Sequence, residues 1–184
     1  TVTGTNGWNV TWTQEATLSF NTVASPNRRI TLFSGVAASG VAGTLTVAYG
    51  GATQTSTGWS LVQVTGNAAS GYTVQVKTSA LNTVGTAFTV TFDSAMTGTT
   101  NGNLAGISRA DSTGTTPGTG FTEISDTTWT APATDLEVNN LINDPSCDWT
   151  WTGGTRAGAI MVEVNTAIAA GTTFPGWGYQ GGWW

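Results

Sequence analysis

The feature that most constrains this chain is an alternation of apolar and polar residues that repeats with a period of two. Residues 72–77 (YTVQVK), 88–93 (FTVTFD) and 45–49 (LTVAY) all follow it. This period places one set of side chains on each face of a β-strand. Threonine fills many of the polar positions, and its β-branched side chain suits an extended backbone with one face in water. The pattern therefore predicts half-buried strands.

Short strand-like segments continue along the chain, and glycine or asparagine separates them. They are residues 10–13, 16–21, 28–33, 59–65, 103–109, 127–131, 135–141, 148–152 and 156–165. Gly153 and Gly154 lie between the last two, where glycine readily adopts the positive φ of a turn. Strands at this spacing favour an antiparallel sandwich or jelly roll over parallel βαβ units. We predict an all-β, jelly-roll-like single domain over residues 28–166, with extended terminal segments at 1–27 and 167–184.

The composition excludes several classes of chemistry. The 184 residues include no histidine and one cysteine. The serine-histidine-aspartate triad, histidine-based zinc sites and cysteine-rich zinc sites therefore have no ligands or bases here. We expect no enzymatic activity, no cofactor and no metal.

The charge balance argues against two kinds of partner. Five basic residues oppose ten acidic ones, for a net charge of −5. Nucleic-acid binding depends on a basic surface that neutralises phosphates, and this chain lacks the residues to build one. No apolar stretch approaches the roughly 20 residues of a membrane-spanning helix. We expect neither nucleic-acid nor membrane partners.

The last eleven residues are unusually aromatic. Aromatic residues interleaved with glycine there are Phe174, Trp177, Tyr179, Trp183 and Trp184. So much aromatic surface would promote aggregation if it stayed in water. It could pack on its own sandwich, dock on a neighbouring subunit or bind a ligand. Because tryptophan and tyrosine dominate interface energetics, we predict an interface here, together with Trp8 and Trp12 near the other end of the chain.

A second tryptophan pair occurs on a later predicted strand. Trp149 and Trp151 share a face with Cys147. Coplanar indoles could form a platform for a glycan, or they could be part of the core or of a seam between subunits. We expect Cys147 to be a small buried hydrophobic residue.

Four acidic residues are candidates for catalysis or for calcium binding. Asp135 and Glu137 share a strand face, and Asp144 and Asp148 flank a turn. Glycosidases use two carboxylates, and calcium takes oxygen ligands. The spacing matches no EF-hand loop, so ordinary surface carboxylates are the favoured interpretation. Arg109 and Asp111 are close enough to form a local ion pair, of the exposed kind that contributes under about 1 kcal/mol.

The middle of the chain resembles a known family. Residues 45–54 (LTVAYGGATQ) look like the VTYGG strand and turn of tailed-phage virion β-sandwich proteins. Residues 72–76, 88–92, 105–117 and 157–164 fit the segments that follow in that family. The resemblance covers about residues 28–166, and it implies a virion component without catalytic residues.

The resemblance and the low charge together suggest a function. We expect a virion structural protein, specifically a capsid decoration protein that binds the major capsid protein or neighbouring copies and forms homo-oligomers. The alternative is a carbohydrate-binding sandwich of a phage tail fibre or an adhesin. An enzyme dependent on aspartate or glutamate alone is the third hypothesis.

Overall fold

The computed structural model describes residues 2–5, 10–22, 27–36, 43–49, 54–64 and 72–167, and of residues 2–5, 166 and 167 it describes the backbone alone. The described residues form ten β-strands and no helix. The strands are β1 (Val2–Thr5), β2 (Thr13–Phe20), β3 (Arg28–Ser34), β4 (Thr44–Val47), β5 (Thr73–Thr91), β6 (Asn101–Arg109), β7 (Thr116–Pro117), β8 (Thr122–Thr130), β9 (Ala133–Ile142) and β10 (Ser146–Ala167). All pairings are antiparallel, which confirms the predicted all-β sandwich.

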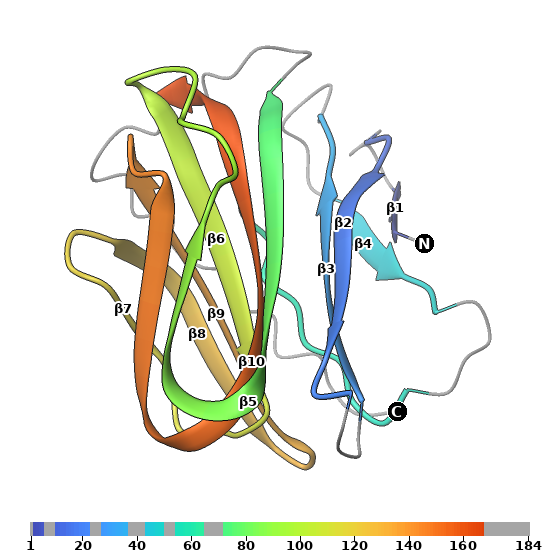
Figure 1. Cartoon of the computed structure of the whole chain (residues 1–184). Helices are drawn as coiled ribbons and strands as arrows, with labels where there is room; N and C mark the ends of the chain where they lie inside the picture. The colour runs from blue at the N-terminus through green and yellow to red at the C-terminus, as the bar shows by residue number, and fades with distance from the viewer. Residues whose placement is uncertain are drawn as a thin grey trace.

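One six-stranded sheet folds over on itself to make the two layers of the sandwich. Its order is β5-β10-β6-β9-β8, and β7 adds to β10. β5 and β10 pair with each other along nearly their whole length and both turn back at one end, so that each contributes to both layers (Figure 1). The second half of β10 lies in the main layer beside β6, whereas its first half pairs with β7 in the covering layer. We refer to this first half of β10, residues 146–152, as the β10 flap.

The bend in β10 falls at the glycines that were expected to form a turn between two strands. The pairing with β5 is irregular between Thr150 and Thr155, and Gly153 has a φ of 82°. The chain therefore continues as one strand through a kink, where a glycine can take a positive φ without steric cost. The predicted strands at 72–77 and 88–93 are likewise the two ends of β5.

Other strand predictions differ from the structure at their edges. Residues 10–12 and 59–64 are predicted as strands but are not strands in the structure. The other predicted segments match strands whose ends differ from the prediction, namely β2, β3, β4, β6, β8 and β9. β2 falls inside the expected N-terminal segment 1–27, yet it pairs with β3 and the hairpin packs on the main layer.

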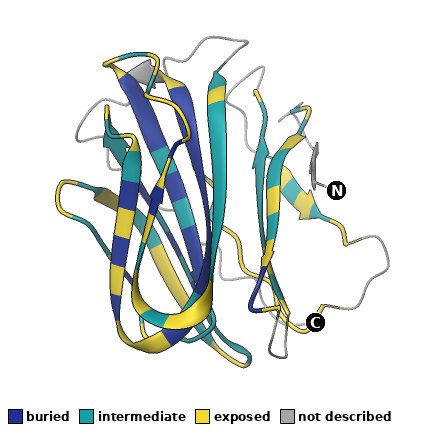
Figure 2. Ribbon diagram, in the orientation of Figure 1, coloured by how far each residue is buried: buried dark blue, intermediate teal, exposed yellow. Residues whose placement is uncertain are grey.

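The β2–β3 hairpin covers the outer face of the main layer. Phe20 is fully buried against Gly158 of β10, and the Ile30 side chain reaches toward Gly106 of β6. The Arg28 Nη2 group donates a hydrogen bond to the Ala133 carbonyl at 2.7 Å. Buried residues concentrate on β6 and β10, which are covered on both faces (Figure 2).

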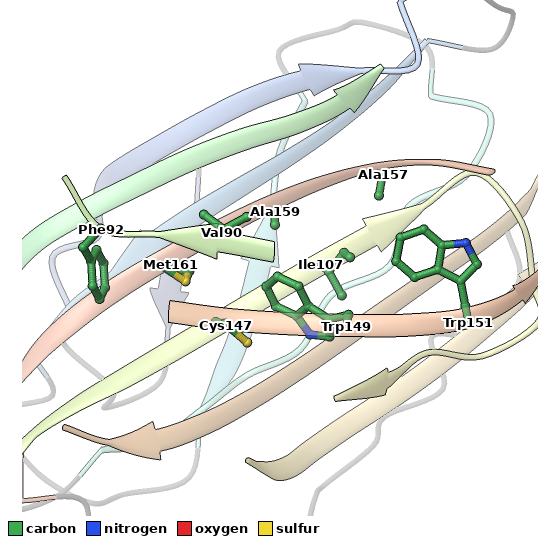
Figure 3. Packing of buried hydrophobic residues seen from close by; sticks show 10 residues of the cluster. Val90, Phe92, Ile107, Cys147, Trp149, Trp151, Ala157, Ala159 and Met161 are labelled. Atoms are coloured by element: carbon green, nitrogen blue, oxygen red, sulfur yellow. The ribbon is translucent and has the colours of Figure 1, made fainter. Parts of the chain in front are cut away.

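The main core lies between the two layers. The β10 flap and the end of β5 supply one side, and β6 with the second half of β10 supplies the other (Figure 3). The buried members are Val90, Phe92, Ala105, Ile107, Cys147, Trp149, Trp151, Ala157, Ala159 and Met161. Small alanines on the main layer leave room for the two indoles opposite, as close packing requires.

Candidate functional site

Of the three interpretations open for the pair Trp149 and Trp151, the structure supports the core. Trp149 is 0% exposed and Trp151 is 8% exposed. The Trp151 indole N–H donates a hydrogen bond to the Gly85 carbonyl at 2.9 Å. A sugar ring stacks on an accessible aromatic face, so these two residues cannot form the platform. The glycan-platform alternative fails for this pair because the β10 flap turns this strand face inward.

Cys147 lies on the same inward face and is fully buried, as expected. The Asn139 side-chain amide donates to its sulfur at 3.4 Å. Burial raises the pKa of the thiol far above its ordinary value. The thiolate is the reactive form of cysteine, so Cys147 is chemically inert in the folded protein.

The predicted terminal interface is described at one position. Phe174, Trp177, Tyr179, Trp183, Trp184 and Trp8 lie outside the described residues. Trp12 is half-buried and packs next to Gly35, and its indole nitrogen is buried without a hydrogen-bond partner among the described residues.

Three large apolar side chains outside these predictions form an exposed group, which we call the Trp59 patch. Tyr49, Trp59 and Leu61 are 41%, 43% and 45% exposed. The Tyr49 hydroxyl hydrogen-bonds to Thr57, two residues before Trp59. Within residues 57–61, Gly58 and Ser60 contact β8, whereas Trp59 and Leu61, which alternate with them, are exposed.

The inward-facing residues of this segment attach it to the edge strand β8. The Ser60 hydroxyl lies 2.8 Å from the Ser125 hydroxyl. Gly58 lies directly against the Trp129 ring, where any Cβ would clash. Because Gly58 and Ser60 hold one side of the segment against β8, Trp59 and Leu61 are presented to the outside. Residues 43–49 and 54–64 contain no charged residue.

A second group of functional interest is buried between the layers and carries ionisable side chains. Arg109 and Asp135 are paired across β6 and β9, both are fully buried, and their Nη2 and Oδ2 atoms are 2.8 Å apart. The Asp111 carboxylate is 2.7 Å from Arg109 Nη1, which confirms the expected local pair. The expectation of exposure was wrong, since Arg109 is enclosed and stacks on Trp151 (5.1 Å from Cζ to the ring centroid).

Glu137 follows Asp135 on the same inward face and has no hydrogen-bond partner among the described residues. Burial raises its pKa to about 8, and the negative charges of Asp126, Glu123 and Asp135 add to the effect. Asp126 pairs with Glu137 in the register of β8 and β9. Burial and interaction with Asp135 raise the pKa of Asp126 to about 7. The expectation that Asp135 and Glu137 lie on a solvated face was therefore wrong.

A third buried carboxylate, Glu163, is fully satisfied. Its Oε1 accepts hydrogen bonds from the Thr97 backbone and hydroxyl and from Asn101, and its Oε2 accepts one from Gln75. Burial alone would raise the pKa of Glu163, but these hydrogen bonds outweigh it and hold the pKa below its ordinary value.

The carboxylates do not assemble into a metal centre in the part of the chain that the structure describes, where no group of three or more His, Cys, Asp or Glu could hold an ion. The described residues also contain no helix long and apolar enough to cross a membrane. Comparison with protein-family models, with curated proteins and with solved structures found no match.

The Trp59 patch was missed because residues 59–65 were interpreted only as a strand. The signal was present: Trp59 and Leu61 are two residues apart, so an extended backbone places them on one face. The buried carboxylates had no such signal, because the sequence around them (DLEVNNL) fits a strand with its apolar residues inward.

Proposed function

We propose that this chain is a virion structural protein, a capsid decoration protein of a tailed phage that stabilises the particle through contacts with the major capsid protein or with neighbouring copies. The Trp59 patch is the observation that carries this proposal. Tyr49, Trp59 and Leu61 each leave more than two fifths of their surface in water. Exposed groups of large apolar residues commonly mark protein–protein contacts.

The surroundings of the patch support a contact that does not depend on charge. The segments that carry it are uncharged, so its burial would desolvate no charged side chain of these segments. Tryptophan and tyrosine are the residues most enriched among interface hot spots. The resemblance of residues 28–166 to phage virion β-sandwich proteins supports the same function, and the aromatic residues of the C-terminal segment support a homo-oligomer.

The proposal is tested with the double variant W59S/L61S. Its binding to particles of the virus that encodes it is measured by co-sedimentation, and its native mass by analytical ultracentrifugation. Loss of a hot-spot residue costs about 2 kcal/mol or more, so we expect particle affinity to fall by about 30-fold or more.

Val84→Ser is the matched control, because Val84 is 63% exposed and lies at the bend of β5, away from β8. Circular dichroism shows whether each variant keeps its fold. Wild-type affinity of W59S/L61S would contradict the role of the patch. A second variant that lacks residues 174–184 tests the aromatic terminal segment separately, and unchanged binding there would reject that predicted interface.

Glycan binding is the second candidate, and the observation that favours it is the pair of exposed aromatic rings in the same patch. The Tyr49 hydroxyl is bonded to Thr57, two residues before Trp59, and both rings are more than two fifths exposed. The platform would then lie here rather than at Trp149 and Trp151. A glycan array followed by fluorescence titration tests it: Trp59→Ala should abolish the signal, and an array without binding would reject it.

A further inference from the structure

The neighbours of Glu137 define its position along the strands, between the two layers of the sandwich. It lies on β9 between Asp135 and Asn139, and all three side chains are buried on the inward face. Asn139 contacts Cys147 of the β10 flap at 3.4 Å. At the other end, Arg109 pairs with Asp135 and stacks on Trp151. The level of Glu137 therefore corresponds to Trp149, the inward residue between Cys147 and Trp151.

The two groups at this level lack partners in the same way. Both carboxylate oxygens of Glu137 and the indole nitrogen of Trp149 are buried, with no hydrogen-bond partner among the described residues. Figure 3 shows Trp149 in a row with Cys147 and Trp151, on the side of the flap that faces Ile107. Ile107 is the register partner of Glu137 on β6. An unpaired carboxylate at such a place costs far more free energy than a neutral carboxyl group.

The charges that act on Glu137 come from β8, β9 and β6, and most of them are negative. β8 supplies Asp126 and Glu123, and β9 supplies Asp135. On the flap side, the Cys147 thiol is neutral, and the carboxylates of Asp148 and Asp144 lie near enough to Cys147 to help raise the pKa of its thiol. Arg109 of β6 opposes them, but it is already paired with Asp135 and Asp111. Ionisation of Glu137 would therefore place a bare charge among carboxylates.

We propose that Glu137 is a proton-linked lock between the layers: its neutral carboxyl group allows the β10 flap to close on the main layer, and release of its proton to water opens the flap. Opening would hydrate the new carboxylate and separate Trp149 from the face that Glu137 shares with Asp135 and Asn139. The elevated pKa of about 8 supports this assignment and places the transition between neutral and mildly alkaline solution. The lock does not depend on the proposed virion function.

The test is hydrogen exchange of the intact protein, followed by mass spectrometry between pH 5.5 and 9. The rate for residues 146–152, corrected for the intrinsic pH dependence of exchange, should rise by up to about tenfold per pH unit until Glu137 is ionised. E137Q mimics the neutral carboxyl group, so its corrected rate should stay flat. Residues 157–164 of the same strand are the internal control and should respond less than the flap.

Equal pH dependence of the flap in the wild-type protein and in E137Q would overturn the proposal. If E137Q does not fold, carbon-13 NMR of the wild-type carboxyl groups decides the question. Titration of Glu137 near its ordinary value of 4.5 would also overturn the lock, whereas titration well above pH 6 with a simultaneous shift of the Trp149 indole resonance would support it.

Discussion

The Arg109 guanidinium stacks on the Trp151 indole, with Cζ 5.1 Å from the ring centroid, although the two residues belong to opposite layers of the sandwich. The same guanidinium donates to Asp135 on the neighbouring strand β9 and to Thr115 in the loop that follows β6. One buried cation therefore connects β6, β9, the loop and the β10 flap. Its removal should affect all of them together.

Arg109→Met is expected to lower the free energy of unfolding by about 3–5 kcal/mol. The substitution preserves an apolar stem but leaves the fully buried Asp135 carboxylate without its counter-charge, and the loss of one partner of a buried ion pair costs about this much. Urea denaturation followed by fluorescence measures the change.

Lys77→Met is the control for this variant. Lys77 pairs with Asp93 at 2.5 Å, but the Asp93 side chain is 78% exposed. Exposed pairs contribute at most about 1 kcal/mol. Losses of similar size in the two variants would show that burial of Arg109 has no special importance.

Gly158→Ala is expected to destabilise the packing of the β2–β3 hairpin on the main layer. A Cβ at Gly158 would lie 2.5 Å from Phe20 Cδ1 and 2.7 Å from Cγ. The Phe20 ring is fully buried and cannot move aside freely, so we expect a loss of about 1–3 kcal/mol, as overpacking typically causes. Thermal unfolding of the variant measures it.

Gly106→Ala on the adjacent strand is the matched substitution. Its nearest contact would be the Glu137 carbonyl at 3.8 Å, an ordinary van der Waals distance. The variant should stay within about 0.5 kcal/mol of the wild-type protein. A larger loss at Gly106 than at Gly158 would contradict the packing described here.

The strands could be predicted from the sequence because their signal is local. The alternation in residues 88–93 and the glycines around it indicate an extended segment without knowledge of the rest of the chain. The folding of β5 and β10 into both layers could not be predicted in this way. Gly153 and Gly154 are equally compatible with a hairpin turn and with a kink in one strand, and long-range pairing with β5 decides between them.

The sequence predicts which face of a strand is buried only where the apolar face is the one that packs inward. β9 has Leu136 and Val138 on one side and Asp135, Glu137 and Asn139 on the other. In the structure the polar side is the buried one, where Arg109 compensates the charge of Asp135, whereas Leu136 and Val138 are half-buried. No rule based on alternation could identify this inversion, because it depends on an arginine in another strand.

Cys147 is expected to be unreactive toward thiol reagents in the native protein. Its side chain is fully buried and burial raises the pKa of the thiol, so little thiolate is accessible. Incubation with a chromogenic disulfide at pH 7 should release little colour from the native protein and one equivalent in denaturant. Rapid native reaction at pH 7 would show that the β10 flap is open there, against the arrangement in Figure 3.

Glu163→Gln is expected to destabilise the protein at pH 7 by about 1–3 kcal/mol, because Gln75 would then face an amide group in place of a carboxylate oxygen. The folded-state pKa of Glu163 is below its ordinary value of 4.5. The folded protein therefore binds this proton less readily, and the stabilisation is present above pH 4.5 and lost as the pH falls through the folded-state value. Urea denaturation of both proteins from pH 3 to 8 should show a difference that narrows in acid, and a constant difference would mean that the Glu163 charge contributes nothing.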